Sequence, residues 1–118
     1  MTMQPIPELD SAVAKAIGLS SGAIIDGRYF ISGAERCLIE HGEDYGHTNI
    51  ACYPWSPSTD ANAALKAADR FFRRGYGQWW QVRRIDDKWQ FLAPRIGVDV
   101  DGQSLPHAIC LAILKAKE

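Results

Sequence analysis

The stretch SLPHAICLAILKA, residues 104–116, decides how the rest of the chain must fold. Ser104 is a favourable helix N-cap, and Pro106 falls in the first turn, where its missing N–H costs little. Apolar side chains then occupy most of the helical circumference. Such a helix needs cover on more than one side, so we expect a sheet against it and another helix or a second subunit opposite.

Two aromatic-rich runs precede this helix, QWWQVRRI at 78–85 and WQFLAP at 89–94. Asp86-Asp87 joins them, which predicts an antiparallel hairpin. Alternation places Trp80 and Val82 on one face, and we expect the tryptophans of the hairpin to be buried as a wall of the core. Residues 96–100 are expected to add a third strand.

Two amphipathic helices and a further hairpin are predicted upstream. The apolar positions from Leu9 to Ile17 follow a helical period, and Asp60 or Thr59 can cap a helix that runs to Gly75. The expected buried face of that second helix consists of Ala61, Ala64, Leu65, Ala68 and Phe72. Asp26-Gly27 favours a tight turn between residues 23–25 and 29–31.

Residues 20–52 are the part of the chain whose conformation the sequence defines least. Ser32 and Glu35 have the spacing of a capping box, which predicts a short helix, although an extended segment remains an alternative. Residues 42–49 are polar and glycine-rich, as is typical of a long loop. Residues 50–53 are a candidate strand.

The totals predict one small α+β domain over residues 1–118. Hydrophobic residues make up 47% of the 118 residues and charged residues 23%, which favours a packed core over disorder. There is no apolar run near bilayer length and no secretion signal at the start, so we expect a cytoplasmic protein that does not bind membranes. Three irregularly spaced cysteines predict reduced thiols.

Three segments, in their order, carry a resemblance: PWSPSTDANAALKAADRFF at 54–72, WWQVRRIDDKWQFLAP at 79–94 and SLPHAICLAILKA at 104–116. They resemble the phage ABA sandwich domain family, small proteins of bacteriophages and prophages. The resemblance implies a three-layer α/β/α sandwich, with a small, mainly antiparallel sheet and helices on both faces. It also implies an accessory role in a bacterial host cell, and it brings no catalytic residues.

The segment 66–88 is basic, with seven basic and three acidic side chains, in a chain of net charge -1. The candidate binding residues are Arg70, Arg73, Arg74, Tyr76, Trp79, Arg83 and Arg84. Such residues can contact phosphates and stack on bases, or form a protein-binding patch. A pI near 6.3 and the expected burial of the tryptophans weigh against nucleic acid.

The loop at 41–52 contains the metal-capable side chains His41, Glu43, Asp44, His47 and Cys52. The two histidines are six residues apart, a spacing that fits neither the helical pair of zincins nor a zinc finger. A polar loop without metal is therefore the preferred interpretation, and no cofactor is expected. His107 is expected to pack or cap rather than to act as a base.

The leading functional hypothesis is a non-enzymatic interaction protein that engages an unidentified host or phage protein, for example as an inhibitor of a bacterial defence system. The chain has no recognisable catalytic or phosphate-cradling motif to favour catalysis. One alternative is a small nucleic-acid or nucleotide binder that uses residues 66–88. Another is a metal-dependent enzyme built on the 41–52 loop, and a homodimer is compatible with each of them.

Overall fold

The structure is a computed structural model that describes residues 4–20, 22–41, 52–75 and 79–117, with the backbone alone at 40–41 and 73–75. The helices of these residues are α1 (Pro7–Ala16), α2 (Gly33–His41), α3 (Ala61–Ala68) and α4 (Leu105–Lys117). Helix α3 continues into a π-helical segment η1 (Asp69–Gly75), and a 3-10 turn forms η2 (Pro94–Ile96). The strands are β1 (Ala23–Ile25), β2 (Arg28–Ser32), β3 (Cys52–Pro54), β4 (Gln81–Ile85), β5 (Lys88–Ala93) and β6 (Val98–Gly102).

The strands form two antiparallel sheets of three strands each, ordered β1-β2-β3 and β4-β5-β6. Each sheet begins with a hairpin whose turn contains positive φ angles, 51° at Asp26 and 76° at Gly27 in the first, and 54° at Asp86 in the second. Asp and Gly adopt this left-handed conformation at low cost. Both predicted hairpins are therefore confirmed, and β6 is the predicted third strand.

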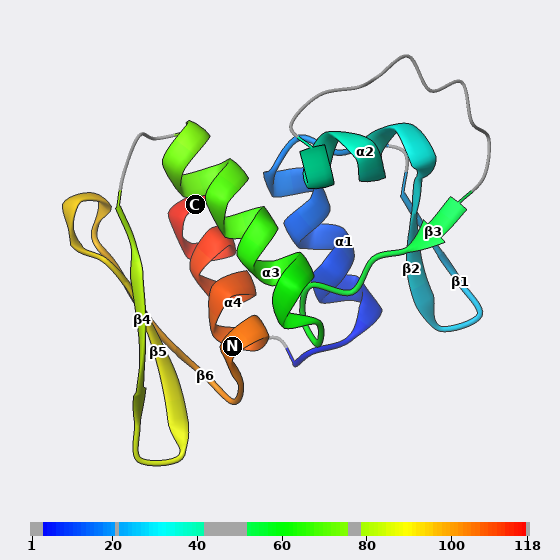
Figure 1. Ribbon diagram of the computed structural model, residues 1–118. Helices are drawn as coiled ribbons and strands as arrows, with labels where there is room; N and C mark the ends of the chain where they lie inside the picture. The colour runs from blue at the N-terminus through cyan, green and yellow to red at the C-terminus, as the bar shows by residue number, and fades with distance from the viewer. Residues whose placement is uncertain (1–3, 21, 42–51, 76–78, 118) are drawn as a thin grey trace.

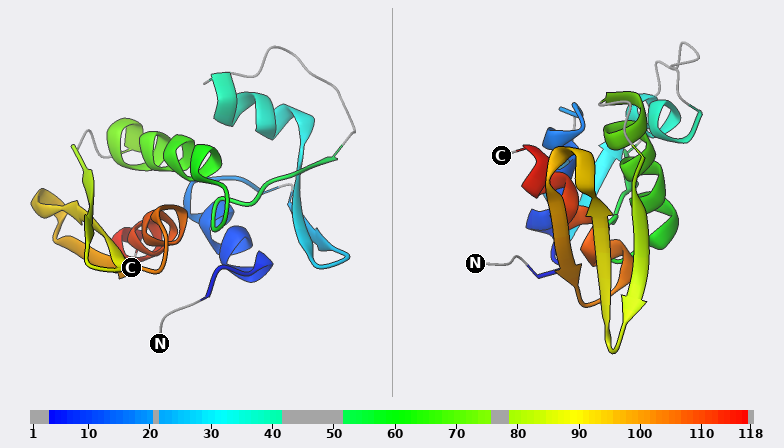
Figure 2. Two further views of the ribbon diagram at one scale, coloured as in Figure 1. Left: turned by 60° about the horizontal axis from the view of Figure 1, so that its bottom comes forward. Right: turned by 90° about the vertical axis from the view of Figure 1, so that its left-hand side faces the viewer.

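Helices α1, α3 and α4 lie between the two sheets, with β4-β5-β6 on one side and β1-β2-β3 on the other (Figures 1 and 2). Helix α2 contacts β2, β3 and α3, and it lies beside one end of β2 (Figure 1). The predicted α+β class is confirmed. The three-layer α/β/α sandwich is not confirmed, because the strands divide into two sheets and the helices occupy the middle.

Helix α4 is the centre of this arrangement. It contacts β5 and β6 on one side, and α1 and α3 on the other. Its buried residues are Pro106, His107, Ala108, Ile109, Cys110, Ala112 and Ile113. The expected two-sided cover is present, and within the described chain it comes from a sheet and two helices.

The inner face of β4-β5-β6 is aromatic, as the alternation predicts. Phe91 is fully buried, the Trp80 ring stacks on it at 5.4 Å between centroids, and Phe72 of η1 lies 4.9 Å away. Two expectations are wrong. Trp79 is 77% exposed because it precedes the strand and its neighbour takes the inward position, and Leu65 lies on the exposed side of α3.

The core face of α3 and η1 is instead built by the positions next to Leu65 in the helical period. Ala64, Ala67, Ala68, Phe71 and Phe72 are buried, with the i, i+3, i+4, i+7, i+8 spacing of a single face. Leu65 is rotated away from that face by one residue. Three positions of this buried face are alanines, and their small side chains let α3 pack closely against α4, which it contacts.

Polar side chains fix the helix ends. The Ser104 hydroxyl accepts from the His107 backbone N–H at 3.2 Å, and His107 Nδ1 accepts from the Gln103 N–H at 3.1 Å. The capping role predicted for His107 is therefore confirmed. Ser32 Oγ accepts from the Glu35 N–H at 3.2 Å, so residues 33–41 are the predicted helix rather than an extended segment.

A buried carboxylate ties the first turn of α1 to the turn that precedes α3. Asp10, which is 4% exposed, accepts through Oδ1 from the Ser58 backbone N–H at 2.8 Å. Burial raises the pKa of Asp10 above its ordinary value, and the hydrogen bond from Ser58 opposes this only in part.

None of the described helices is both long and apolar enough to cross a membrane.

The contact between β6 and α4 predicts that Gly102→Ala destabilises the protein. A Cβ at residue 102 would meet the backbone N of Ala108 and lie 2.6 Å from its Cα, so the sheet and the helix must move apart. We expect a loss of about 1–3 kcal/mol in the free energy of unfolding, measured by urea denaturation. Gly97→Ala is a comparison without a steric clash: it has open space but φ 73°, and should lose about 1–2 kcal/mol from backbone strain alone. Equal stability of Gly102→Ala and wild type would contradict this packing.

Burial of Asp10 predicts a pH-dependent stability. The folded-state pKa of Asp10 lies above the ordinary value of 3.8. At a pH between these two pKa values, the Asp10 carboxyl therefore holds a proton in the folded chain that it has released in the unfolded chain. The stability contributed by Asp10 is thus present below about pH 4 and is lost as the pH rises through the raised pKa. Asp10→Asn keeps an oxygen acceptor for the Ser58 N–H but does not titrate. The free energy of unfolding of Asp10→Asn, relative to that of wild type, should therefore increase between about pH 4 and pH 7. The exposed turn variant Asp87→Asn should follow the wild type, and identical pH profiles for all three proteins would refute the account.

Candidate functional site

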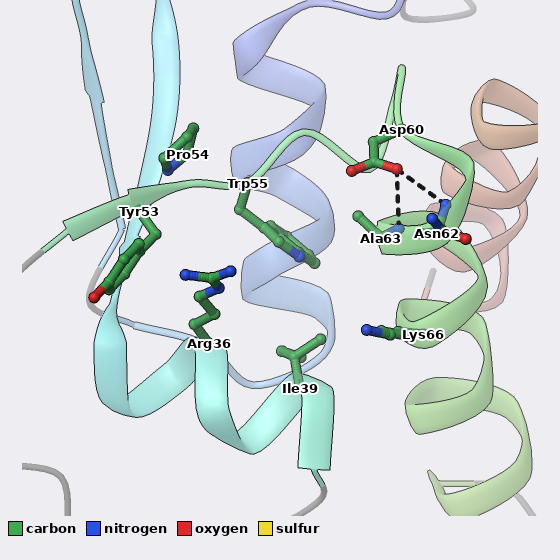
Figure 3. Close-up of a pocket in the computed structure, with 9 residues that line it drawn as sticks. All are labelled: Arg36, Ile39, Tyr53, Pro54, Trp55, Asp60, Asn62, Ala63 and Lys66. Atoms are coloured by element: carbon green, nitrogen blue, oxygen red, sulfur yellow. Dashed lines mark hydrogen bonds between the residues drawn. The ribbon is translucent and has the colours of Figure 1, made fainter.

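A pocket of about 380 Å³ lies between α2, β3 and the beginning of α3 (Figure 3). This volume is near the lower end of pockets that hold small molecules. The residues that line it come from three segments: Arg36, Ile39, Tyr53, Pro54, Trp55, Asp60, Asn62, Ala63 and Lys66.

Trp55 forms the rigid part of the pocket. Its side chain is only 6% exposed, and its ring centroid lies 6.3 Å from that of Tyr29. Its backbone N–H donates to the carbonyl of Tyr29 at 2.9 Å, which extends the contact between β2 and the segment that follows β3. Trp55 is therefore held both by its ring, which packs near Tyr29, and by its backbone hydrogen bond. The part of the ring that reaches the pocket forms an apolar floor together with Ile39.

Two cationic side chains enter the pocket from opposite sides. The guanidinium carbon of Arg36 lies 4.4 Å from the centroid of the Tyr53 ring, and the group points between Tyr53 and Trp55 (Figure 3). Stacking on an aromatic face orients the guanidinium plane. Lys66 points toward the same space from α3 (Figure 3).

Asp60 is the one carboxylate among the described residues that line the pocket, and it is engaged at the helix end. Asp60 Oδ1 accepts from the backbone N–H groups of Asn62, at 3.0 Å, and Ala63, at 3.5 Å. It is the N-cap of α3, as predicted.

The predicted basic site is described only in part. Arg70 is partly buried, and its Nε donates to the Ile17 carbonyl at 3.4 Å, so it satisfies the C-terminal end of α1. Arg73 and Arg74 belong to η1, with side chains outside the described residues, and Tyr76 lies outside them altogether. Their predicted binding role stays a prediction.

The remaining predicted residues lie on or beside β4. Trp79 lies two residues before the strand and is the most exposed large apolar side chain of the described chain. Arg83 and Arg84 are consecutive, so they point to opposite faces of the sheet. Arg83 Nε donates to Gln90 Oε1 at 2.7 Å, and Gln90 Nε2 donates to Asp99 Oδ1 at 2.6 Å, which forms a polar row across the outer face.

The predicted metal-capable loop falls almost entirely outside the described residues. Of its candidates, Cys52 is described and is exposed, while His41 is described only by its backbone. Glu43, Asp44 and His47 are not described. Over the residues that are described, no three His, Cys, Asp or Glu side chains gather as a metal site.

Comparison with known proteins gives no relative. No family model matches the chain, and neither the curated proteins nor the solved structures contain a significant match. The resemblance to the phage ABA sandwich domain family therefore has no support from these comparisons. In the structure, the SPSTD segment that contributes to it carries the Ser58 contact to Asp10 and the Asp60 cap.

Sequence reasoning missed the pocket because its residues come from separate segments whose contact depends on the tertiary fold. Arg36 lies on a short helix, Tyr53 on a strand, and Lys66 on the far side of a capped helix from the buried face. Asp60 was the lining residue with a local signal, since its position before a helical pattern predicted the N-cap of α3.

The cap predicts opposite results for two substitutions at Asp60. Asp60→Ala removes the acceptor of two backbone N–H groups and should lower the free energy of unfolding by about 0.5–2 kcal/mol. Asp60→Asn keeps an oxygen acceptor, and should stay close to wild type in the same urea titration. If the alanine variant is as stable as the asparagine variant, the carboxylate is not the cap and is available to the pocket.

Proposed function

We propose that this chain is a non-enzymatic binding protein that engages another protein through strand β4 and Trp79, which lies two residues before the strand. The observation that carries the proposal is Trp79, whose side chain is 77% exposed at the start of this strand. Tryptophan and arginine are enriched among the residues that dominate protein interfaces. Trp79 therefore serves as the aromatic anchor, and Arg83 and Arg84 lie farther along the same strand.

The backbone of β4 supports the same proposal. Strand β4 is at the edge of its sheet, paired with β5 on one side, and four of its five residues are exposed. An edge strand presents unpaired N–H and C=O groups that an extended segment of another protein can join. The partner then adds a strand to the sheet, and Trp79 packs against one of its side chains.

The charge of β4 indicates what type of partner segment fits beside it. Arg83 and Arg84 put a positive charge on each face of β4, so an acidic extended segment fits best. In antiparallel pairing with the β4 strand of a second copy, arginines come close to arginines, which is destabilising. We therefore favour a different protein over the homodimer.

The identity of the partner is a further proposal. The resemblance of residues 54–72, 79–94 and 104–116 supports an unidentified host or phage protein as the target. It also supports a cytoplasmic accessory role in a bacterial host cell, such as the inhibition of a defence system. The metal-dependent alternative at 41–52 gains no support from the described residues.

One observation favours nucleic acid as a second candidate. Trp79 is exposed and the strand that follows it carries two arginines, and proteins that bind single strands combine aromatic side chains that stack on bases with cations that contact the backbone. The engagement of Arg70 with Ile17 and of Arg83 with Gln90 reduces the cations available to phosphates. Protein binding therefore remains the better supported candidate.

The test compares matched variants in quantitative affinity capture from a bacterial lysate. Trp79→Ala should lose at least about 90% of a protein that wild type captures, because an anchor of this kind contributes about 2 kcal/mol or more. Ile24→Ala, on the edge strand β1 of the other sheet, is the matched exposed apolar control and should capture as wild type does.

Charge reversal separates the candidates. Arg84→Glu should abolish capture of an acidic partner, whereas Arg95→Glu, on η2, should leave it intact. Binding of a labelled single-stranded oligonucleotide that weakens steeply with salt and is lost in Trp79→Ala would favour the nucleic-acid candidate instead. Capture that is the same for wild type, Trp79→Ala and Arg84→Glu would refute the protein-binding proposal.

A further inference from the structure

The free edge of β4 constrains the sequence of a segment that pairs with it. We propose that the partner segment runs antiparallel to β4, with a carboxylate beside Arg84 and a branched apolar side chain beside Val82. In sequence this is Glu or Asp, then any residue, then Val or Ile. The inference rests on the proposed protein contact and deepens it, because it assigns the selection of the acidic residue to Arg84 rather than to Arg83.

The backbone groups that face the free edge belong to Val82 and Arg84. Strand β4 lies at the margin of its sheet, as the right-hand view of Figure 2 shows. Ile85 pairs with Lys88 across a two-residue turn. The pair that closes such a turn is hydrogen-bonded, and bonded and non-bonded pairs alternate along an antiparallel ladder. Val82 and Arg84 therefore belong to the non-bonded pairs, and their N–H and C=O groups point away from β5 toward a joining strand.

The two arginines of β4 are in different surroundings. Arg83 lies on the outer face, where its Nε donates to Gln90 Oε1 at 2.7 Å, and Gln90 in turn donates to Asp99. Arg84 lies on the opposite face beside its cross-strand neighbour Trp89 and is exposed. Within the described part of the chain, Arg84 has no hydrogen bond or ion pair. Arg83 is thus engaged by its own sheet, and Arg84 is the cation that can select a carboxylate.

Val82 puts an apolar side chain on the same face as Arg84. It is half-buried, packs against the core and lies opposite Phe91 of β5. Residues two positions apart on a strand share a face, so the partner residues beside Val82 and Arg84 are also two positions apart. A branched apolar side chain beside Val82 covers the part of it that is still exposed.

The direction of the partner follows from the order of these two positions. Antiparallel pairing is the more stable kind of strand pairing. An antiparallel partner meets Arg84 before Val82, so its acidic residue precedes its apolar residue. The C-terminal part of the segment then lies toward Trp79. The reverse order of the two residues fits only a parallel strand.

The test is an NMR titration of the intact chain with two heptapeptides of identical composition, acetyl-TTETVTT-amide and acetyl-TTVTETT-amide. The threonines favour the extended conformation. With the first peptide, the backbone amides of Val82 and Arg84 should shift and saturate. The second peptide exchanges Glu and Val and should bind at least about three-fold more weakly, because it loses both cross-strand contacts.

Variants compare the two arginines. Arg84→Gln should weaken binding of the first peptide by about three-fold or more, and by more than Arg83→Gln does. The exposed Arg95→Gln on η2 is the control and should bind as wild type does. Arg84→Glu should lose binding of the first peptide and bind acetyl-TTKTVTT-amide instead. This exchange of charge preference also shows that the variant is folded.

Three results would overturn the inference. The first is the absence of saturable shifts at Val82 and Arg84 with the acidic peptide. The second is equal affinity for the two peptide orders, or tighter binding of the exchanged one. The third is an effect of Arg83→Gln as large as that of Arg84→Gln. Capture that depends on Trp79 reads out the proposed function separately, so the protein contact can stand when this sequence preference fails.

Discussion

The fold depends on covering an apolar helix from two sides at once. Helix α4 is buried over most of its turns, with the β4-β5-β6 sheet against one side and α1 and α3 against the other. Close approach is possible because Gly102 has no Cβ where Ala108 passes, and because α3 presents alanines. With the aromatic face of β5 committed to this contact, β4 is left as an edge strand, and the second sheet packs on α1.

This arrangement assigns many conspicuous polar residues to structural work. His107 binds the backbone at the start of α4, Arg70 satisfies the end of α1, and Asp10 joins α1 to the turn before α3. What remains for recognition is on two separate surfaces, the Trp79 end of β4 and the pocket with Arg36 and Lys66. Both contain aromatic and cationic side chains, which are enriched at binding surfaces.

Local chemistry was readable from the sequence wherever a few consecutive residues determine the outcome. The caps at Ser32, Asp60 and Ser104 and the Asp-Gly turn follow from side-chain acceptors and left-handed backbone angles, and each is present. The division into two sheets was not predicted, because strand pairing between distant segments has no local signature. The exposure of Trp79 and the assembly of the pocket likewise depend on which neighbours the tertiary fold supplies.

The central claim, that α4 is the element around which the others are organised, predicts where exchange of amide hydrogens is slowest. Amides of residues 109–113, inside α4, should exchange only through global unfolding, with an opening free energy equal to that from urea denaturation. Amides of the short exposed strand β1 should open at far lower free energy. Exchange of the α4 amides through local opening, at a free energy well below that of global unfolding, would contradict this account.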